Sequence, residues 1–184
     1  MARLPYPDYE DKNFKAAGKP TINVFKLLSY SAGTVDLWTS IGNAHFTKIT
    51  FSKKQRELII LLSSAKFGSY YEWTHHIPLS TKFGVTHEQR EEMKRAAKVK
   101  GYFSDTYWKV NPASFDEQEQ VILTFLEAVI DAPEVDEEIW QKATEKLSQR
   151  QIVELITMQG FYYTLGRVTT ALKIDMEGGI KPRL

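Results

Sequence analysis

One short segment of the 184-residue sequence concentrates side chains that could carry out acid–base chemistry. Residues 68–84 contain two of the four histidines, His75 and His76, and also Glu72, four residues before His76. Residues i and i+4 of a helix are neighbours, so the carboxylate of Glu72 is expected to hydrogen-bond to the imidazole of His76. Such a pair can take up and release protons near pH 7. The spacing fits a catalytic dyad, and it fits a purely structural contact as well.

A helical projection of this segment separates the two histidines. At about 100° per residue, Ser69 and Trp73 lie at the centre of one face, with His76 beside them and His75 on the opposite side. We therefore expect His76 to face inward and His75 to face outward. Pro78 cannot donate a backbone hydrogen bond and its ring crowds the preceding turn, so a kink is expected just beyond the histidines.

Two further charged residues lie on apolar faces of expected helices. Glu57 shares a face with Ile60 and Leu61, which fits either an ordinary acid in the first turn of a helix or a functional group. Arg167 lies on a stripe with Tyr163 in the last helix. A buried cation needs an anionic partner, because an unpaired buried charge is costly. That partner is expected to be Glu57, another acid of the protein, or the carboxylate of a substrate.

The composition excludes several classes of chemistry. The chain has no cysteine, which excludes disulfides, thiolate metal sites and thiol-based redox catalysis. A net charge of +1 provides no field for holding nucleic acid. The sequence has a single Glu-x-x-His motif, Glu72 to His75, and metal sites need more ligands than this. We therefore expect neither a metal nor another cofactor.

No segment has the pattern of a signal peptide or of a membrane span. The N-terminal residues 1–13 are polar and contain two prolines, unlike the apolar core of a signal peptide. The longest apolar runs, near residues 58–62 and 121–123, are far shorter than the ~20 residues that a spanning helix needs. A cytoplasmic protein without membrane or nucleic-acid partners is expected.

Four capping boxes mark the expected helix starts, because a Ser or Thr followed three residues later by Gln or Glu satisfies free backbone groups there. They lie at Ser52–Gln55, Thr86–Gln89, Ser114–Glu117 and Ser148–Gln151. The apolar spacing predicts helices near residues 22–31, 34–45, 53–67, 69–83, 87–99, 115–130, 137–146 and 149–173, and no strands. We expect an all-α chain of about eight helices, forming a single domain over residues 1–184. An extended arm (residues 1–20) and a tail (residues 177–184) flank the helices.

Several motifs together resemble the carboxymuconolactone decarboxylase family, whose superfamily includes the AhpD-type alkylhydroperoxidases. They are the run from Arg56 to Ile60, then Gly68, the segment from Glu72 to His76, and Gly84 to Thr86, within residues 51–95. The resemblance implies an AhpD-like all-α fold. It also implies a homo-oligomer, either a trimer or a hexamer, with pockets near the subunit contacts.

The resemblance also separates two activities. The peroxidase branch uses a Cys-x-x-Cys pair, and those two positions are occupied here by Ser69 and Glu72. The glutamate on the preceding helix and the histidine of that branch correspond to Glu57 and His76. Thiol peroxidase activity is therefore excluded. The decarboxylase branch has a glutamate four residues before its histidine, as Glu72 and His76 are placed here, and it is the better match.

The resemblance implies a cofactor-free lyase or isomerase that acts by acid–base catalysis on a carbonyl- or lactone-bearing carboxylic acid. His76 is expected to be the general acid or base, Glu72 to orient it or share its proton, and Glu57 to relay protons. The residues expected to bind the substrate are Ser69, Tyr70, Trp73, Phe83, Tyr163 and Arg167. The alternative is a non-catalytic oligomeric protein that binds a small molecule, in which the pair of Glu72 and His76 is structural.

Overall fold

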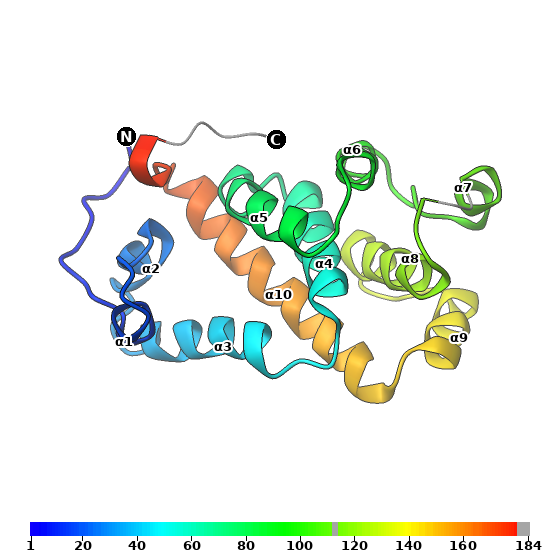
Figure 1. The fold of residues 1–184 in the computed structure, drawn as a ribbon, viewed down its shortest axis with the longest axis horizontal. Helices are drawn as coiled ribbons and strands as arrows, with labels where there is room; N and C mark the ends of the chain where they lie inside the picture. The colour runs from blue at the N-terminus through cyan, green and yellow to red at the C-terminus, as the bar shows by residue number, and fades with distance from the viewer. Residues whose placement is uncertain (112–113, 180–184) are drawn as a thin grey trace.

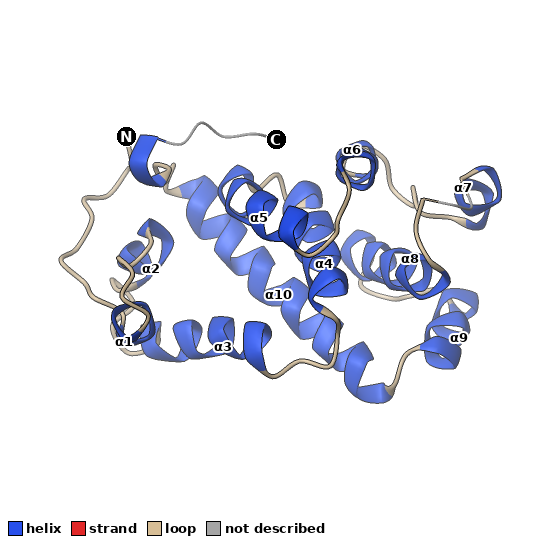
Figure 2. Cartoon of the chain, in the orientation of Figure 1, coloured by secondary structure: helices blue, strands red, loops and turns tan. Residues whose placement is uncertain are grey.

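The computed structural model describes residues 1–111 and 114–179 as helices joined by loops and turns (Figure 2). Across these ranges the ten α helices are α1 (Lys12–Ala16), α2 (Asn23–Leu28), α3 (Val35–Thr47), α4 (Lys53–Lys66), α5 (Tyr70–Lys82), α6 (His87–Ala96), α7 (Asp105–Val110), α8 (Glu117–Asp131), α9 (Glu137–Lys146) and α10 (Gln149–Ala171). A 3-10 helix, η1 (Glu177–Gly179), follows α10. No strand occurs in the described ranges, which confirms the predicted all-α class.

The short helices α1 and α7 raise the number of helices above the expected eight. Asp11 begins α1 by accepting hydrogen bonds from the backbone N–H groups of Asn13 and Phe14, at 2.9 and 3.2 Å. Ser104 caps α7 in the same way. Neither start is a complete capping box, and five or six residues are too few to show a periodic apolar face. The expectation of an extended arm is therefore wrong for residues 12–16. Residues 180–184 of the expected tail lie outside the described residues.

Three of the four expected capping boxes are present. The boxes that begin at Ser52, Thr86 and Ser148 start α4, α6 and α10. The fourth is wrong, because α8 is capped by Asp116, which forms a complete box with Glu119. An aspartate caps a helix as well as a serine does. Asp116 lies two residues after Ser114, so α8 begins two residues later than a cap at Ser114 would place it.

α4 lies at the centre of the hydrophobic core. Its residues 58–62 have no exposed surface, and α4 packs against α5, α6, α8 and α10. A helix that is apolar on all sides over one and a half turns must be covered on all sides. Functional groups on α4, including Glu57, are consequently held in a rigid frame.

The long helix α10 crosses the molecule diagonally, with α1 to α3 on one side and α6 to α9 on the other (Figure 1). The first residues of the chain lie along the end of α10. The N–H of Arg3 donates to the carbonyl of Leu172 at 2.8 Å, and the N–H of Ala2 donates to the carboxylate of Asp175 at 2.9 Å. Both ends of the described chain are thereby held near the C-terminal end of α10 and the start of α5.

α5 continues as an α helix from Tyr70 through Pro78 to Lys82, so Pro78 does not end the helix. Pro78 is exposed, and its ring therefore lies on the side of the helix that faces solvent. None of the helices in the described ranges is long and apolar enough to cross a membrane.

Candidate active site

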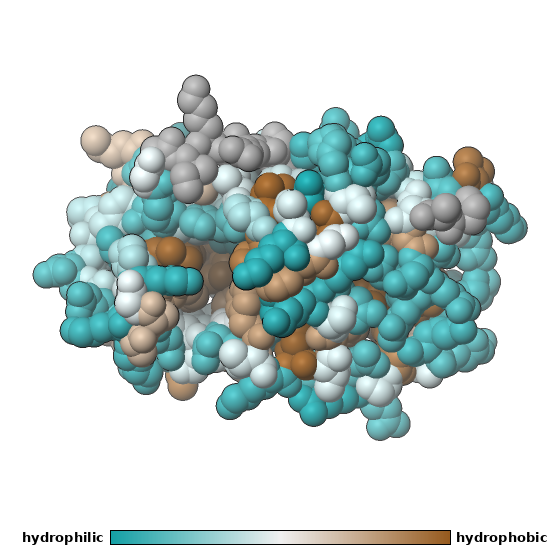
Figure 3. Space-filling view, viewed as in Figure 1, coloured by the Kyte–Doolittle hydropathy of each residue, from teal (hydrophilic) through white to brown (hydrophobic). Residues whose placement is uncertain are grey.

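A cavity of about 550 Å³ lies between the N-terminal helices α1 to α3 and the helices α5 and α10. Figure 3 shows the molecule hollowed in this region, with hydrophobic residues inside the hollow. Its apolar walls include Phe14, Phe25, Phe46, Leu79, Phe161 and Leu165. The volume is within the usual range for small-molecule sites, as is the mostly apolar lining with a few polar groups.

α5 presents one side of this cavity. Glu72, His75, His76 and Leu79 follow the i, i+3, i+4, i+7 spacing of a single helical stripe, and all four line the cavity. His76 is buried, as predicted. The expectation that His75 faces outward is only partly correct, because its half-buried ring forms part of the cavity wall. The helical projection did not identify this polar stripe, which lies at the edge of a buried helix.

The partner of His76 is Glu57 and not Glu72. Nδ1 of His76 lies 2.8 Å from Oε2 of Glu57, which has no exposed surface. The expected hydrogen bond between Glu72 and His76 is therefore wrong. Nδ1 of the ring points toward α4, where Glu57 lies, whereas the carboxylate of Glu72 points toward Ser69 and α10.

Arg56 completes a buried ion pair behind the histidine. Its Nε and Nη2 donate to Oε1 of Glu57 at 3.0 and 2.8 Å, and its guanidinium lies 4.3 Å from the ring centre of Phe46. Burial alone would raise the pKa of Glu57, but the hydrogen bonds and charges of His76 and Arg56 outweigh it and lower that pKa. Glu57 is thus ionised, and it holds the proton of His76 on Nδ1.

The second ring nitrogen of His76 is directed toward the cavity side of α10. The hydroxyl of Tyr162 lies 3.3 Å from Nε2, and both residues line the cavity. In the tautomer that carries its proton on Nδ1, Nε2 is an acceptor and the tyrosine hydroxyl is the donor. Phe46 stacks against the imidazole with ring centres 6.0 Å apart. Burial raises the pKa of Tyr162 far above its ordinary value, so its hydroxyl keeps its proton.

Glu72 is a second group in the cavity that can exchange a proton. Its Oε2 accepts hydrogen bonds from the hydroxyls of Ser69 and, at 3.1 Å, Thr169. Its Oε1 is buried without a hydrogen-bond partner among the described residues. Burial raises the pKa of Glu72 to about 7, and this effect exceeds the opposing hydrogen bonds. The carboxyl can therefore act either as an acid or as a base near neutral pH.

A glycine on α10 allows this arrangement. A Cβ added at Gly166 would lie 3.1 Å from the Cβ of Ser69, so a side chain at this position would require α10 or the start of α5 to shift by a few tenths of an ångström. Ser69 is at the N-cap of α5, yet its side chain makes no capping hydrogen bond and instead donates to Glu72. The first turn of α5 and the end of α10 together position the carboxyl.

The end of the described chain is bound to residues that line the cavity. The carboxylate of Glu177 accepts hydrogen bonds from the backbone N–H of Asn23 at 2.6 Å and from the hydroxyl of Tyr71, and it lies 2.7 Å from Nε2 of His75. Burial acts to raise the pKa of Glu177, but these partners lower it to about 2. Glu177 is thus a permanent anion that anchors α2 and α5 to the residues after α10.

The residues expected to bind substrate are not gathered at the cavity. Ser69 does not line the cavity and is connected to it through its hydrogen bond to Glu72. Trp73 is fully buried in the core, with Nζ of Lys94 5.8 Å from its ring, whereas Tyr70 is about half exposed. These three residues lie outside the polar stripe of α5 that faces the cavity.

Phe83, Tyr163 and Arg167 also lie away from the cavity. The ring centre of Phe83 lies 5.4 Å from the guanidinium of Arg56, and Phe83 does not line the cavity. Arg167 is exposed and lies 5.1 Å above the ring of Tyr163, which is itself exposed. The expectation of a buried, paired Arg167 is therefore wrong. Apolar residues occur on all sides of α10, including exposed Val153, so their spacing could not identify its inner face.

Within residues 1–111 and 114–179, no group of three or more His, Asp or Glu side chains is placed to hold a metal ion. The polar groups of the cavity instead form acid–imidazole and acid–hydroxyl contacts. Their chemistry is that of proton transfer and hydrogen bonding to an organic ligand.

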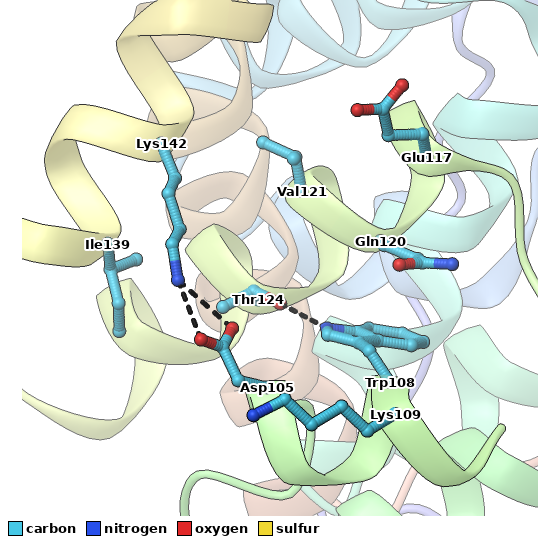
Figure 4. Close-up of a pocket in the computed structure, with 9 residues that line it drawn as sticks. All are labelled: Asp105, Trp108, Lys109, Glu117, Gln120, Val121, Thr124, Ile139 and Lys142. Atoms are coloured by element: carbon cyan, nitrogen blue, oxygen red, sulfur yellow. Dashed lines mark hydrogen bonds and ion pairs between the residues drawn. The ribbon is translucent and has the colours of Figure 1, made fainter. Parts of the chain in front are cut away.

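A second pocket, of about 360 Å³, lies among α7, α8 and α9 (Figure 4). Four of its polar groups form pairs with one another: Nζ of Lys142 lies 2.8 Å from Oδ2 of Asp105, and the indole of Trp108 donates to the hydroxyl of Thr124 at 2.9 Å. It presents no buried acid or histidine, so it lacks the proton-transfer groups of the larger cavity.

No protein-family model and no curated protein matches the sequence. Solved structures do match. An uncharacterized peroxidase-related protein from Silicibacter sp. TM1040 has a TM-score of 0.74 and 18% identity, over 99% of this chain and 96% of that one. A peroxidase-related protein with an alkylhydroperoxidase AhpD core, from Ralstonia eutropha JMP134, has a TM-score of 0.70 and 16% identity, over 99% and 98% of the two chains.

The debrominase Bmp8, solved as a Cys-to-Ala variant in complex with 2,3,4-tribromopyrrole, has a TM-score of 0.65 and 16% identity. The match covers 91% of this chain and 82% of that one. At these identities the likeness concerns the fold. The chain has the AhpD-like helical fold, which confirms the fold that the sequence motifs implied.

Proposed function

We propose that this AhpD-like chain is a cofactor-free lyase or isomerase that transfers protons to and from a carbonyl- or lactone-bearing carboxylic acid. The observation that carries the proposal is the pair of residues on one stripe of α5: Glu72 and His76 both line the same apolar cavity, one helical turn apart. Two groups that can each hold or release a proton near neutrality are what general acid–base catalysis requires.

The proposed reaction passes through an enolate-like anion. Loss of carbon dioxide, or of a proton next to a carbonyl, leaves the electron pair on carbon and oxygen. The hydroxyl of Tyr162 then donates a hydrogen bond to the oxygen, as oxyanion-stabilising groups do. After loss of carbon dioxide, the neutral carboxyl of Glu72 gives its proton to carbon; in an isomerisation, Nε2 of His76 returns to carbon the proton that it removed. Glu57 keeps His76 in the tautomer whose Nε2 faces the cavity.

The apolar walls support a substrate with a flat ring. Phe25, Phe46 and Phe161 line the cavity, and aromatic rings pack well against such walls. The debrominase of the same fold binds a substituted pyrrole. This chain has no cysteine, so no thiol-dependent step is part of the proposal.

A screen in D₂O tests the proposal. The protein is incubated with a panel of aryl β-keto acids and carboxylated butenolides, and carbon-bound deuterium is followed by NMR, because both decarboxylation and isomerisation leave a deuteron on carbon. We expect turnover of at least one member, reduced about tenfold or more in Glu72→Gln and in His76→Ala while both variants stay folded. Absence of any turnover, or unchanged turnover in both folded variants, would contradict the proposal.

The alternative is a non-catalytic small-molecule binder. The buried contacts among Arg56, Glu57 and His76 favour it in one respect, because such an ion pair is also an ordinary structural device. In that case Glu57→Gln destabilises the fold, and no acid of the panel is turned over.

We also propose a homo-oligomer. Large apolar side chains are exposed on α3 and α10, namely Leu37, Ile41, Val153, Ile156 and Tyr163. Exposed large apolar side chains occur on surfaces that another subunit covers when they form one contiguous patch. Light scattering distinguishes a trimer or hexamer from a monomer.

A further inference from the structure

We propose that Lys19, at the mouth of the cavity, binds the acidic group of the ligand, so that the site takes a flat apolar molecule carrying one carboxylate. The inference rests on the proposed function in placing the ligand in the same cavity. It assigns to Lys19 the role that the sequence suggested for Arg167, which lies on the outer face of α10.

Apart from Glu72, the other charged or titratable groups that line the cavity already have partners. Asp11 accepts the capping hydrogen bonds of α1, His75 faces Glu177, and His76 faces Glu57. Lys19 lines the cavity, is exposed, and makes no ion pair with any residue in the described part of the chain. It is therefore the cation available to an incoming anion.

The backbone holds Lys19 in place. Gly18 adopts φ of +64°, a left-handed conformation that favours glycine, and the N–H of Lys19 donates to the carbonyl of Phe14 at 2.9 Å. Phe14 packs on Phe25 with ring centres 5.7 Å apart. The N–H of Asp11 donates to the hydroxyl of Thr21 at 2.8 Å. The turn that carries the lysine is consequently fastened to the cavity wall on both sides.

The two ends of the cavity differ in the way such a ligand requires. Lys19 is in contact with solvent, so it can attract an anion without being buried unpaired. At the inner end Oε1 of Glu72 is buried and has no hydrogen-bond partner among the described residues. Phenylalanine rings line the same cavity. A carboxylate at the mouth and a carbonyl or hydroxyl group at the inner end would satisfy both polar ends.

Calorimetric titration with two probes tests the inference. The probes are 2-naphthoate and 2-naphthamide, which share a ring system and differ in charge. They are titrated into the wild-type protein and into the variants Lys19→Met and Lys12→Met. Lys12 is an exposed lysine at the start of α1, the short helix that precedes Lys19, and it does not line the cavity, so its removal changes the net charge equally.

We expect Lys19→Met to weaken naphthoate binding about three- to tenfold and to leave naphthamide binding unchanged, with Lys12→Met affecting neither. Equal weakening of both probes by Lys19→Met would reduce Lys19 to a packing role and overturn the inference. So would unchanged naphthoate binding, equal weakening by the two lysine variants, or no binding of either probe to the wild type. These titrations involve no turnover, so charge-selective binding without activity in the D₂O screen contradicts the proposed function alone.

Discussion

Replacing Glu72 with Gln removes a buried carboxyl whose pKa differs strongly between the folded and unfolded chain. Burial raises this pKa to about 7, compared with 4.5 for an unperturbed glutamate. Between these two values the folded chain holds a proton that the unfolded chain has released. The contribution of Glu72 to the free energy of unfolding is therefore complete below about pH 4.5 and is lost as the pH rises to about 7.

The size of this effect follows from the two pKa values. At about 1.4 kcal/mol for each pH unit, the interval from 4.5 to about 7 corresponds to about 3 kcal/mol. The free energy of unfolding of the wild type should fall by this amount relative to Glu72→Gln between pH 4.5 and 8. Other titrating groups, such as buried His45 with its lowered pKa, are present in both proteins and cancel in the difference.

Urea unfolding of both proteins across this pH range measures the difference. Glu88→Gln is the matched control, because Glu88 is exposed and its pKa lies below the ordinary value, so it is ionised in both states above about pH 6. The control should differ from the wild type by an amount that does not change above that pH. A difference between wild type and Glu72→Gln that stays constant within about 0.5 kcal/mol would refute the assignment of Glu72 as a proton-exchanging acid near neutrality.

Three further outcomes are expected. Arg56→Ala should cost about 3–5 kcal/mol of unfolding free energy in urea, because it leaves the carboxylate of Glu57 buried without its cation; a cost below about 1 kcal/mol would mean that the pair is not structural. Gly166→Ala should lower the stability by about 1–3 kcal/mol in thermal unfolding, because the new Cβ would lie 3.1 Å from the start of α5. Gly160→Ala, with nothing within 4 Å, should be neutral or stabilising, and equal effects of the two glycine variants would contradict the close approach of α10. Arg167→Ala should leave the turnover unchanged, and a large loss would return this exposed residue to the site.

Much of the helical architecture could be predicted because the helix starts are chemically marked. The boxes at Ser52, Thr86 and Ser148 are local, and a local hydrogen bond depends on few other residues. The short helix α1 was missed because Asp11 caps it without a second acidic or amide residue to complete the box. Local signals therefore predict the longer helices better than the short ones.

The partner of His76 could not be predicted from its own helix. The i+4 spacing brings Glu72 within reach, but Glu57 on α4 reaches Nδ1 first, and Ser69 with Thr169 draws the carboxylate of Glu72 away. Both contacts depend on how α4 and α10 pack against α5. The resemblance to known motifs pointed to Glu57 and His76 together, since family motifs record such packing and helical spacing does not.

Arg167 illustrates a different limit. Apolar residues occur on all sides of α10, so its sequence gives no reason to place Tyr162 rather than Arg167 on the buried face. Only the packing of α10 against α4 and α5 decides which stripe faces inward. Tyr162, and not Arg167, therefore reaches the histidine.

The central claim is that His76 and Glu72 act on a ligand bound in the cavity between α1 to α3 and α5 and α10. A crystal structure with an unreactive analogue of an acid that the protein turns over tests it most directly. We expect the carbonyl or hydroxyl group of the analogue to lie about 3 Å from both Nε2 of His76 and Oε1 of Glu72. An analogue bound instead among α7, α8 and α9, or one that leaves both side chains covered only by apolar groups, would contradict the claim.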